Sequence, residues 1–285
     1  MYLFMKLLED NKSQIIADYI SGKSIKALAK EYNVSGWSIK NIIIKSGIKL
    51  RSLIDLKIKF DESFFFRDSP ETYYFWGFML GDGCLISHKQ GHKYITISLK
   101  ENDVKILEKF CEWLNMDYIH IKRGINNHNT KYVRLELYGS FFKNDFSKFG
   151  FVSNKTYNPV IPEIDAKFIR PFIMGLIDAD GSVAWNKPRT NNIRPHIKQQ
   201  FENSIQLIGH PLIMDWVVAS IRTLGFNGNI NSQIIKGKWK RIRIQRKQDV
   251  ADLSRILEID KYYHFCLERK WSNLYNMLSS CCVAN

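Results

Sequence analysis

Cysteine is scarce in this sequence and never forms the Cys-x-x-Cys pair typical of zinc and dithiol redox sites. The chain has five cysteines, mostly within apolar segments: Cys84, Cys111, Cys266, Cys281 and Cys282. Their odd number and unpaired spacing argue against a disulfide framework as the basis of the fold. We therefore expect a reduced, intracellular protein.

Long hydrophobic runs are also missing. The longest apolar stretch, from Tyr73 to Leu80, is far shorter than the roughly 20 residues that span a bilayer. The apolar start, from Met1 to Leu8, is too short for the core of a signal peptide and is followed directly by Glu9 and Asp10. The sequence therefore predicts neither a membrane span nor an export signal.

Acidic residues are too few to balance the basic ones. The chain has 285 residues, with 42 Lys and Arg against 28 Asp and Glu, which gives a formal net charge of +14. Such an excess favours a polyanionic partner. Basic and aromatic residues are spread along the chain and not collected in one amphipathic helix, so nucleic acid is favoured over a membrane surface. A length near two typical domains and 45% hydrophobic residues exclude a disordered or fibrous chain.

Nucleotide motifs and convincing zinc ligands are absent as well. No Walker A string or GxGxxG motif follows a predicted strand, so the sequence gives no support for nucleotide-driven chemistry. His88 and His92 flank a predicted hairpin turn, but neither has a neighbouring cysteine or acid to complete a zinc site.

The first 52 residues predict a small, basic, all-α domain. Residues 1–60 contain 11 Lys and Arg against 5 Asp and Glu. Apolar residues recur at helical spacing, Ser24 and Ser35 are plausible helix N-caps, and Trp37 to Ser46 is a third predicted helix. The string GKSIKALAKEYNVSGWSIKNII resembles a helix-turn-helix domain of the resolvase or invertase type. The alternative is a three-helix bundle that binds nothing.

That resemblance implies that the third helix enters the major groove of DNA. Its candidate contacts are Trp37, Ser38, Lys40, Asn41 and Lys45. Residues 53–69 are predicted to be a linker that docks through Phe64, Phe65 and Phe66, and Pro70 opens the larger domain.

The larger domain repeats itself, with the order αββαββα occurring twice. We predict an α+β fold of two pseudo-symmetric repeats, 70–158 and 159–285, that form a DNA-binding saddle. In the first repeat the predicted elements are helices over 70–82, 101–115 and 141–149 and strands over 84–88, 93–100, 118–123 and 132–138. In the second they are helices over 165–180, 211–224 and 249–257 and strands over 182–186, 196–201, 229–235 and 239–246, followed by a last helix over 267–278.

Alternation along the strands predicts one buried and one open face for each sheet. In residues 93–100, three apolar side chains alternate with polar ones. Basic, polar and aromatic side chains on an open face can reach both phosphates and base edges of duplex DNA. The candidate contacts are Tyr94, Thr96, Ser98, Arg134, Tyr138, Lys198, Arg241, Arg243 and Gln245. The alternative is an ordinary solvated face.

Each repeat begins with an apolar helix that ends in Asp-Gly, at Asp82 and, 98 positions later, at Asp180. Small residues lie four apart in both helices, at Gly77 and Gly81 and again at Gly175 and Ala179, so the helices can pack with their backbones close together. Two carboxylates at adjacent helix C-termini repel each other and oppose the helix dipoles. A divalent cation removes that conflict, and oxygen ligands are those that Mg²⁺ prefers.

On these motifs the chain resembles the LAGLIDADG homing endonucleases in their two-repeat, single-chain form. GLIDADG (175–181) is close to the defining string of the family, and FWGFMLGDG (75–83) is a diverged copy with Leu80 where the motif has its first Asp. FGFVSNKT (149–156) and LERK (267–270) match further family patterns. The resemblance covers 70–278, and the N-terminal residues resemble DNA-binding modules that some homing endonucleases carry.

The resemblance implies that Asp82 and Asp180 bind Mg²⁺ or Mn²⁺ together with the main-chain carbonyls of Gly81 and Ala179, and that the metals activate water for phosphodiester hydrolysis. Asp178 is interpreted as structural, because Leu80 holds its place in the first motif. The polar groups expected around the scissile phosphates are Lys100, Lys155, Lys270 and Gln200; Lys198 or Glu202 is an alternative to Gln200, and Lys155 and Lys270 are either active-site lysines or phosphate clamps.

The predicted function is therefore a site-specific, metal-dependent endonuclease that cuts double-stranded DNA at a long site, one strand per repeat, as a monomer with internal pseudo-two-fold symmetry. The alternatives are a cleavage-inactive nucleic-acid-binding protein, such as an intron maturase or a transcriptional regulator, and a strand-biased nickase. An intein remnant lacks a splicing Cys or Ser at the start and a His-Asn pair at the end.

Overall fold

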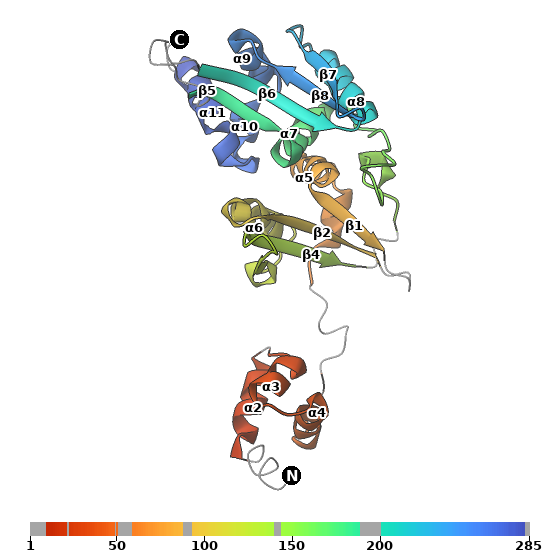
Figure 1. Ribbon diagram of the computed structural model, residues 1–285, viewed down its shortest axis with the longest axis vertical. Helices are drawn as coiled ribbons and strands as arrows, with labels where there is room; N and C mark the ends of the chain where they lie inside the picture. The colour runs from red at the N-terminus through yellow and green to blue at the C-terminus, as the bar shows by residue number, and fades with distance from the viewer. Residues whose placement is uncertain are drawn as a thin grey trace. The chain divides into compact units, whose positions relative to one another are not determined.

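A computed structural model describes residues 10–21, 23–48, 50, 59–87, 93–139, 144–188 and 201–282. The chain forms two compact units, Met1–Lys57 and Ile58–Asn285 (Figure 1). Among the described residues, no helix is both long enough and apolar enough to cross a membrane.

The N-terminal unit contains three short helices around a small apolar core. They are α2 (Lys12–Ile20), α3 (Ile25–Glu31) and α4 (Gly36–Lys45). The predicted caps are confirmed, since the Ser24 and Ser35 hydroxyls accept hydrogen bonds from the backbone N–H groups of Ala27 and Ser38, each at 3.1 Å. The buried core residues are Ile15, Tyr19, Leu28, Ile39 and Ile43.

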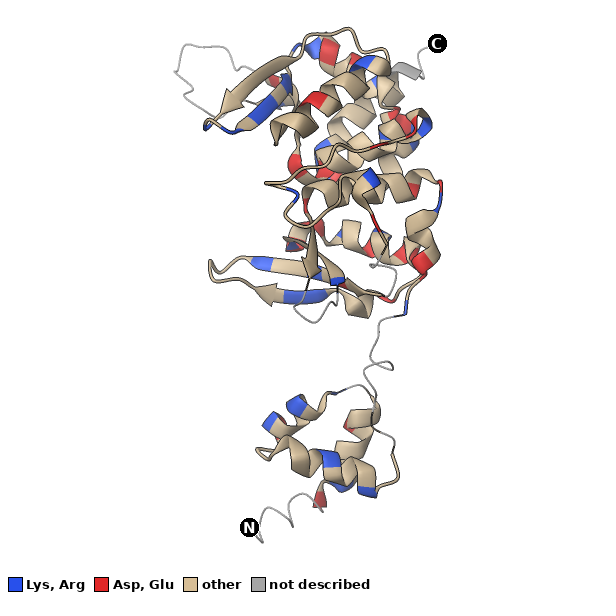
Figure 2. Cartoon of the chain, turned by 90° about the vertical axis from the view of Figure 1, so that its right-hand side faces the viewer, with Lys and Arg blue, Asp and Glu red and all other residues tan. Residues whose placement is uncertain are grey.

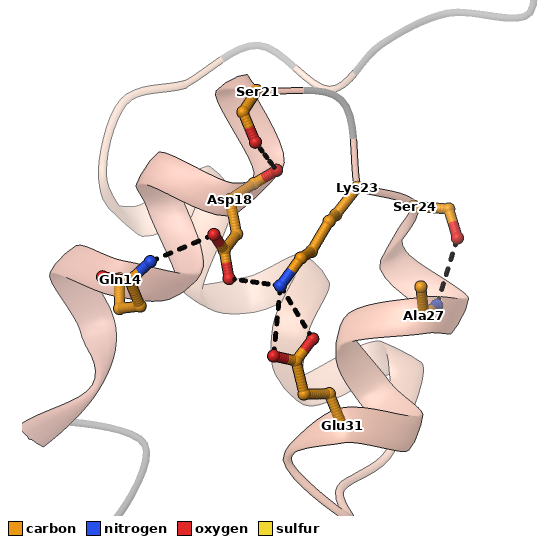
Figure 3. Close-up of polar contacts among 7 residues, drawn as sticks. All are labelled: Gln14, Asp18, Ser21, Lys23, Ser24, Ala27 and Glu31. Atoms are coloured by element: carbon orange, nitrogen blue, oxygen red, sulfur yellow. Dashed lines mark hydrogen bonds and ion pairs between the residues drawn. The ribbon is translucent and has the colours of Figure 1, made fainter.

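A polar network fixes the turn between α2 and α3 (Figure 3). The Lys23 ammonium donates to Asp18 at 2.9 Å and to both carboxylate oxygens of Glu31 at 3.0 and 3.1 Å. Gln14 adds a fourth hydrogen bond, to Asp18 at 3.0 Å. One lysine therefore pairs with both acids, Asp18 and Glu31.

The large unit holds two four-stranded antiparallel sheets, which confirms the predicted α+β class. The elements of the first half are η1 (Glu62–Phe66), α5 (Pro70–Gly81), β1 (Gly83–Ser87), β2 (Lys93–Lys100), η2 (Glu101–Asp103), α6 (Val104–Trp113), η3 (Tyr118–His120), β3 (Lys122–Ile125), β4 (Lys131–Tyr138) and η5 (Ser147–Phe149). Those of the second half are η6 (Ala166–Phe168), α7 (Ile169–Asp180), β5 (Ser182–Pro188), β6 (Phe201–Gly209), α8 (Pro211–Thr223), β7 (Asn231–Ile235), β8 (Trp239–Ile244), α9 (Lys247–Ile256), α10 (Ile259–Tyr262), η7 (Tyr263–Phe265) and α11 (Glu268–Cys282).

The two sheets have the same strand order, β1-β2-β4-β3 and β5-β6-β8-β7. In both, the second strand of the half pairs with the fourth, so the repeat predicted from the sequence is also a repeat of topology. Helices α5 and α7 lie side by side between the sheets (Figure 1). One continuous hydrophobic core joins these helices to the inner faces of both sheets.

Four local predictions differ from the structure. The segment 118–123 begins as a 3-10 turn, and its strand starts only at Lys122; in 141–149, the described part contains only the 3-10 turn η5. Of the strand predicted over 196–201, only Phe201 lies within the described residues; β6 begins there and runs on to Gly209, beyond the predicted end. The three residues after Phe201, namely Glu202, Asn203 and Ser204, are polar, so the apolar alternation that identifies strands is weak there. The last strand ends at Ile244, so Gln245 lies beyond it.

Candidate nuclease site at the ends of two helices

Glycine lets the two central helices touch through their backbones. A Cβ atom at Gly77 would lie 1.9 Å from the Phe172 carbonyl oxygen, and one at Gly175 would lie 2.1 Å from that of Tyr74. Both separations are far below van der Waals contact, so no other residue fits at either position without moving a backbone. The predicted packing of the small-residue stripes is confirmed.

This close approach brings the two motif ends together. A Cβ atom at Gly81 would lie 2.4 Å from the Ala179 Cβ and 3.2 Å from the Asp180 carboxylate. Asp82 is the C-cap of α5, and Asp180 is the last residue of α7. Two acids that are 98 positions apart in sequence therefore emerge at one place, each at the negative end of a helix dipole.

The environment of these acids disfavours their charged forms. Both residues reach solvent, but surrounding protein partly desolvates their carboxyl groups. Desolvation, together with the charge of Asp180, raises the pKa of Asp82 to about 6, while the nearby lysines oppose the shift. Desolvation also raises the pKa of Asp180. Without a bound cation, the fold holds two carboxylates in a place that opposes their ionisation.

Lys155 and Lys270 lie at this site. The Lys155 ammonium donates to the Gly81 carbonyl oxygen at 2.8 Å. The Lys270 ammonium donates to the carbonyl oxygens of Ile177, Asp178 and Gly181, at 3.0, 2.5 and 2.8 Å. Each lysine thus binds carbonyls at the C-terminal end of the motif helix of its own repeat, where a cation is favoured.

Each lysine also acts across the helix interface. Burial lowers the pKa of Lys155. The largest opposing effect comes from the charge of Asp180, which belongs to the other repeat. The pKa of Lys270 is likewise lowered by burial, and Lys270 is the cation that most stabilises ionised Asp82. The two acids and two lysines therefore form one electrostatic unit built from both repeats.

Asp178 has a structural role in this geometry. Its buried carboxylate accepts hydrogen bonds from the Tyr74 hydroxyl at 2.5 Å, the Leu267 N–H at 2.8 Å and the Trp271 indole N–H at 2.7 Å. These donors come from α5, from the residue before α11 and from α11 itself. Asp178 therefore connects three segments through buried hydrogen bonds, which agrees with the structural interpretation of this residue.

The donor set at the paired acids suits a hard divalent cation. Among the described residues, no three or more His, Cys, Asp or Glu side chains cluster as a metal site. A cation here would instead rest on the Asp82 and Asp180 carboxylates, main-chain carbonyl oxygens and water, the ligands that Mg²⁺ takes most readily. Desolvation raises the pKa of both acids, and the charge of Asp180 adds to the shift at Asp82, so a bound cation would favour their ionised forms.

Lys100 is placed differently from the other candidate lysines. It is the exposed last residue of β2, opposite Tyr132 of β4. None of the contacts described for Lys100 joins it to Asp82 or Asp180. Lys198 and Gln200, predicted for the same position in the second repeat, lie outside the described residues.

The strand register identifies a different counterpart for Lys100. Cys84 pairs with Thr96 in the first sheet, and Ser182 pairs with Gln206 in the second. Counting on from these pairs, Lys100 corresponds to His210. The alternative candidate Glu202 is instead occupied on the open face of the second sheet, where Arg243 donates to it at 2.6 Å.

His210 is a functional candidate that sequence reasoning missed. Its Nδ1 accepts a hydrogen bond from the Leu212 N–H at 3.3 Å and so caps α8. It also lines a pocket of about 320 Å³ together with Gly81, Lys155 and Asp180. The misplacement of β6 hid this residue, since only the correct register relates it to Lys100.

The sheets present the predicted open faces. Ile95, Ile97 and Leu99 are buried on one side of β2, and the alternate residues are more exposed. The candidate residues that lie on these open faces are Tyr94, Thr96, Ser98, Arg134, Tyr138, Arg241 and Arg243. Bands of Lys and Arg cross the strands of both sheets (Figure 2).

Side chains on the first open face are already ordered by one another. The Arg134 guanidinium donates to the Ser98 hydroxyl at 2.7 Å and lies over the Tyr132 ring, 5.2 Å from its centre. Tyr94 and Tyr138 stack with ring centres 4.5 Å apart. Such preorganisation lowers the entropy lost when these groups contact a ligand.

The N-terminal candidates share one side of α4. Trp37 is 71% exposed, Lys40 and Lys45 are exposed, and Asn41 is half-buried between them. The Ser38 hydroxyl already hydrogen-bonds with the Ser35 hydroxyl, at 2.9 Å. The helix contains no acidic residue.

An ion pair between the repeats is a second feature that the sequence did not predict. Arg269 of α11 donates to both oxygens of Asp103, at 2.5 and 2.7 Å. Asp103 is nearly buried and occupies the N-cap of α6 without capping it. No local pattern relates these residues, which are 166 positions apart.

Comparisons with known proteins find LAGLIDADG homing endonucleases among the solved structures that this chain resembles. The meganuclease I-AabMI bound to uncleaved DNA is 16% identical, over 74% of this chain and 92% of that one, with a TM-score of 0.43. I-SmaMI bound to uncleavable DNA is 14% identical (72% and 88%, TM-score 0.46), and I-GzeII in complex with its DNA target is 14% identical (76% and 92%, TM-score 0.42). No family model and no curated protein matches. The likeness is remote, so what this chain does is inferred from its own residues.

Proposed function

We propose that this protein is a divalent-metal-dependent DNA endonuclease of the LAGLIDADG type. The observation that carries the proposal is the meeting of Asp82 and Asp180 at the ends of α5 and α7, with Lys155 and Lys270 beside them. Paired carboxylates flanked by lysines suit phosphodiester hydrolysis, because they combine cation ligands with groups that bind the charged phosphate.

The chain's own residues have distinct tasks in this proposal. Asp82 and Asp180 would hold Mg²⁺ or Mn²⁺, together with carbonyl oxygens such as those of Gly81 and Ala179. The bound cations would supply a water of lowered pKa and neutralise charge that develops on the phosphate. Asp178, Tyr74 and the contact glycines Gly77 and Gly175 fix the position of one half against the other. The two acids come from pseudo-symmetric halves, which suits the cutting of one strand by each half.

The open faces of the two sheets are the proposed DNA-binding surface. Their arginines and tyrosines reach phosphates and base edges, and their ordered state favours a specific site. The N-terminal unit is proposed to add contacts through α4, where Trp37, Asn41 and two lysines share a side free of acidic residues. The protein would act as a monomer, because one chain supplies both halves of the site.

The test is cleavage of a randomised duplex library, with sequencing of the cut ends. In Mg²⁺ the protein should cut the duplex at one long site. In Ca²⁺ or EDTA it should bind without cutting, or not bind. Asp82→Asn and Asp180→Asn should abolish double-strand cleavage and leave DNA binding in Ca²⁺ largely intact. Asp252→Asn is the matched control, since Asp252 is an exposed acid paired with Arg255 on α9. Double-strand cleavage retained by both motif variants would refute the metal assignment.

A further inference from the structure

Arg134 is oriented by its neighbours on the open face of the first sheet, but the end of its side chain is unused. Its Nε–H donates to the Ser98 hydroxyl at 2.7 Å, and its guanidinium lies 5.2 Å from the centre of the Tyr132 ring. The Glu136 carboxylate lies 3.8 Å from one Nη nitrogen, which is too far for a hydrogen bond. Among the described contacts, neither Nη group donates a hydrogen bond. Arg134, with 41% of its side chain exposed, therefore presents a planar pair of donors.

Glu136 is the acid that holds this part of the open face together. Its side chain is only 13% exposed, Lys122 donates to it, and the Tyr138 hydroxyl donates to it at 2.9 Å. Burial acts to raise the pKa of Glu136, but the hydrogen bonds from Lys122 and Tyr138 hold that pKa below its usual value. The carboxylate is thus ionised at neutral pH and is occupied by side chains of its own sheet. The strand register places Arg243 at the corresponding position of the second sheet, so this anchor exists in one half only.

The counterpart of Arg134 in the second sheet is held in another way. Ile208 pairs with Arg241 there, as Ser98 pairs with Arg134 in the first sheet. Ile208 has no hydroxyl to accept the Nε–H of the arginine. One Nη group of Arg241 instead donates to the Gln233 side chain at 2.5 Å. The two sheets therefore carry an arginine at the same place, with the Nη groups unused in the first sheet and partly used in the second.

Resting on the proposed function, we propose that Arg134 reads a guanine in the half of the target that the first sheet contacts, and that Glu136 is its positioning residue. Guanine presents two acceptors, O6 and N7, in the major groove, and a planar arginine end donates to both at once. Adenine carries an amino group in place of O6, so it accepts only one of these bonds. Arg241 discriminates less at the corresponding position of the other half, because one of its Nη groups is already bonded.

The experiment measures binding in Ca²⁺ to the selected target and to duplexes that carry each other base pair at each position of this half. The unchanged protein should prefer guanine at one position by about 10-fold or more. Arg134→Lys keeps the charge but removes the paired donors, so it should remove most of that preference and leave those at distant positions unchanged. Glu136→Gln should relax the same position. Arg255→Lys is the matched control, because Arg255 is an exposed arginine paired with Asp252 on α9.

Two results would overturn the assignment to Arg134. One is a guanine preference that survives in Arg134→Lys, and the other is an equal loss of affinity for every duplex, which is expected of a phosphate contact. A preference that is intact in Glu136→Gln would remove the positioning role of that acid.

The same measurement separates this inference from the proposed function, because binding in Ca²⁺ does not require cutting. Guanine-selective binding by a chain that never cuts in Mg²⁺ would refute the nuclease activity and support the inference. Cutting in Mg²⁺ with no base preference that depends on Arg134 would overturn the inference and leave the nuclease activity standing. Failure of the unchanged protein to bind any duplex selectively would overturn the inference as well.

Discussion

At the scale of single residues, Asp82 and Asp180 are expected to lower the stability of the metal-free protein. Their carboxyl groups are desolvated, and the pKa of Asp82 is raised to about 6 against 3.8 in an unfolded chain. A raised carboxyl pKa means that the folded state binds the proton more tightly than the unfolded state does. The metal-free protein therefore loses stability from Asp82 as the pH rises from about 4 to about 6, and the loss is complete above that range.

Asp82→Asn should accordingly stabilise the metal-free protein. We expect a higher melting temperature in EDTA at pH 7.5 and a gain that shrinks progressively below pH 6, because the unchanged Asp82 is then protonated in the folded state. Differential scanning fluorimetry across pH 4 to 8 measures this. In Mg²⁺ the order should reverse, since Asn is a poorer ligand. A variant less stable than the original in EDTA at pH 7.5 would contradict the charge conflict.

Replacement of Asp178 by Asn should instead destabilise the protein, because three donors hydrogen-bond to the Asp178 carboxylate. Asp178→Asn replaces one accepting oxygen with an NH₂ group that faces donors, so we expect a loss of about 3 kcal/mol in the free energy of unfolding. Tyr74→Phe removes only one of the three hydrogen bonds and should cost about 1.5 kcal/mol. Urea denaturation of both variants measures the difference. A neutral Asp178→Asn would show that this carboxylate does not hold α11 to the helix pair.

At the scale of elements, the α5–α7 contact determines the geometry of the site. Gly77→Ala or Gly175→Ala places a methyl group within about 2 Å of a carbonyl oxygen. The clash should exceed the roughly 1 kcal/mol that alanine gains over glycine in a helix, for a net loss of about 2 kcal/mol. Cleavage should fall further than stability does, because the acids move apart.

Gly209→Ala is the control for these variants. A Cβ there meets only the flexible end of Met214 at 2.9 Å, so we expect little change in denaturant midpoint. If Gly77→Ala and Gly175→Ala were as mild as this control, direct backbone contact between the helices would be ruled out.

The sequence predicted most elements because their signals were local. Serine caps, the Pro70 helix start and the alternation in 93–100 each depend on neighbouring residues, and the structure confirms them. The prediction of strand β6 was wrong because polar residues follow Phe201 at its start. The resulting error in register hid His210. The Asp103–Arg269 pair and the three donors around Asp178 could not be predicted, because they join residues separated by many elements. The placement of Lys155 beside the acids was indicated only by a family pattern.

At the scale of the whole molecule, the excess of positive charge predicts strongly salt-dependent binding. If α4 of the N-terminal unit contacts phosphates, Lys40→Ala with Lys45→Ala should weaken DNA binding and reduce the slope of log K against log salt concentration by about 2. Fluorescence anisotropy in Ca²⁺ over a salt series measures this. Lys261→Ala is the control, as Lys261 is paired with Glu258 on the large unit. An unchanged slope would remove α4 from the DNA-binding surface.

The most direct measurement is strand-resolved cleavage of the selected target by the full chain, in Mg²⁺ and in EDTA, with Asp82→Asn and Asp180→Asn beside it. The account predicts cutting of both strands only with the metal, loss of double-strand breaks in either variant, and retained binding in both. Tight binding with no cut under any metal condition would contradict it. Asp82 and Asp180 would then be only the ends of two well-packed helices, and the chain a nucleic-acid-binding protein without catalysis.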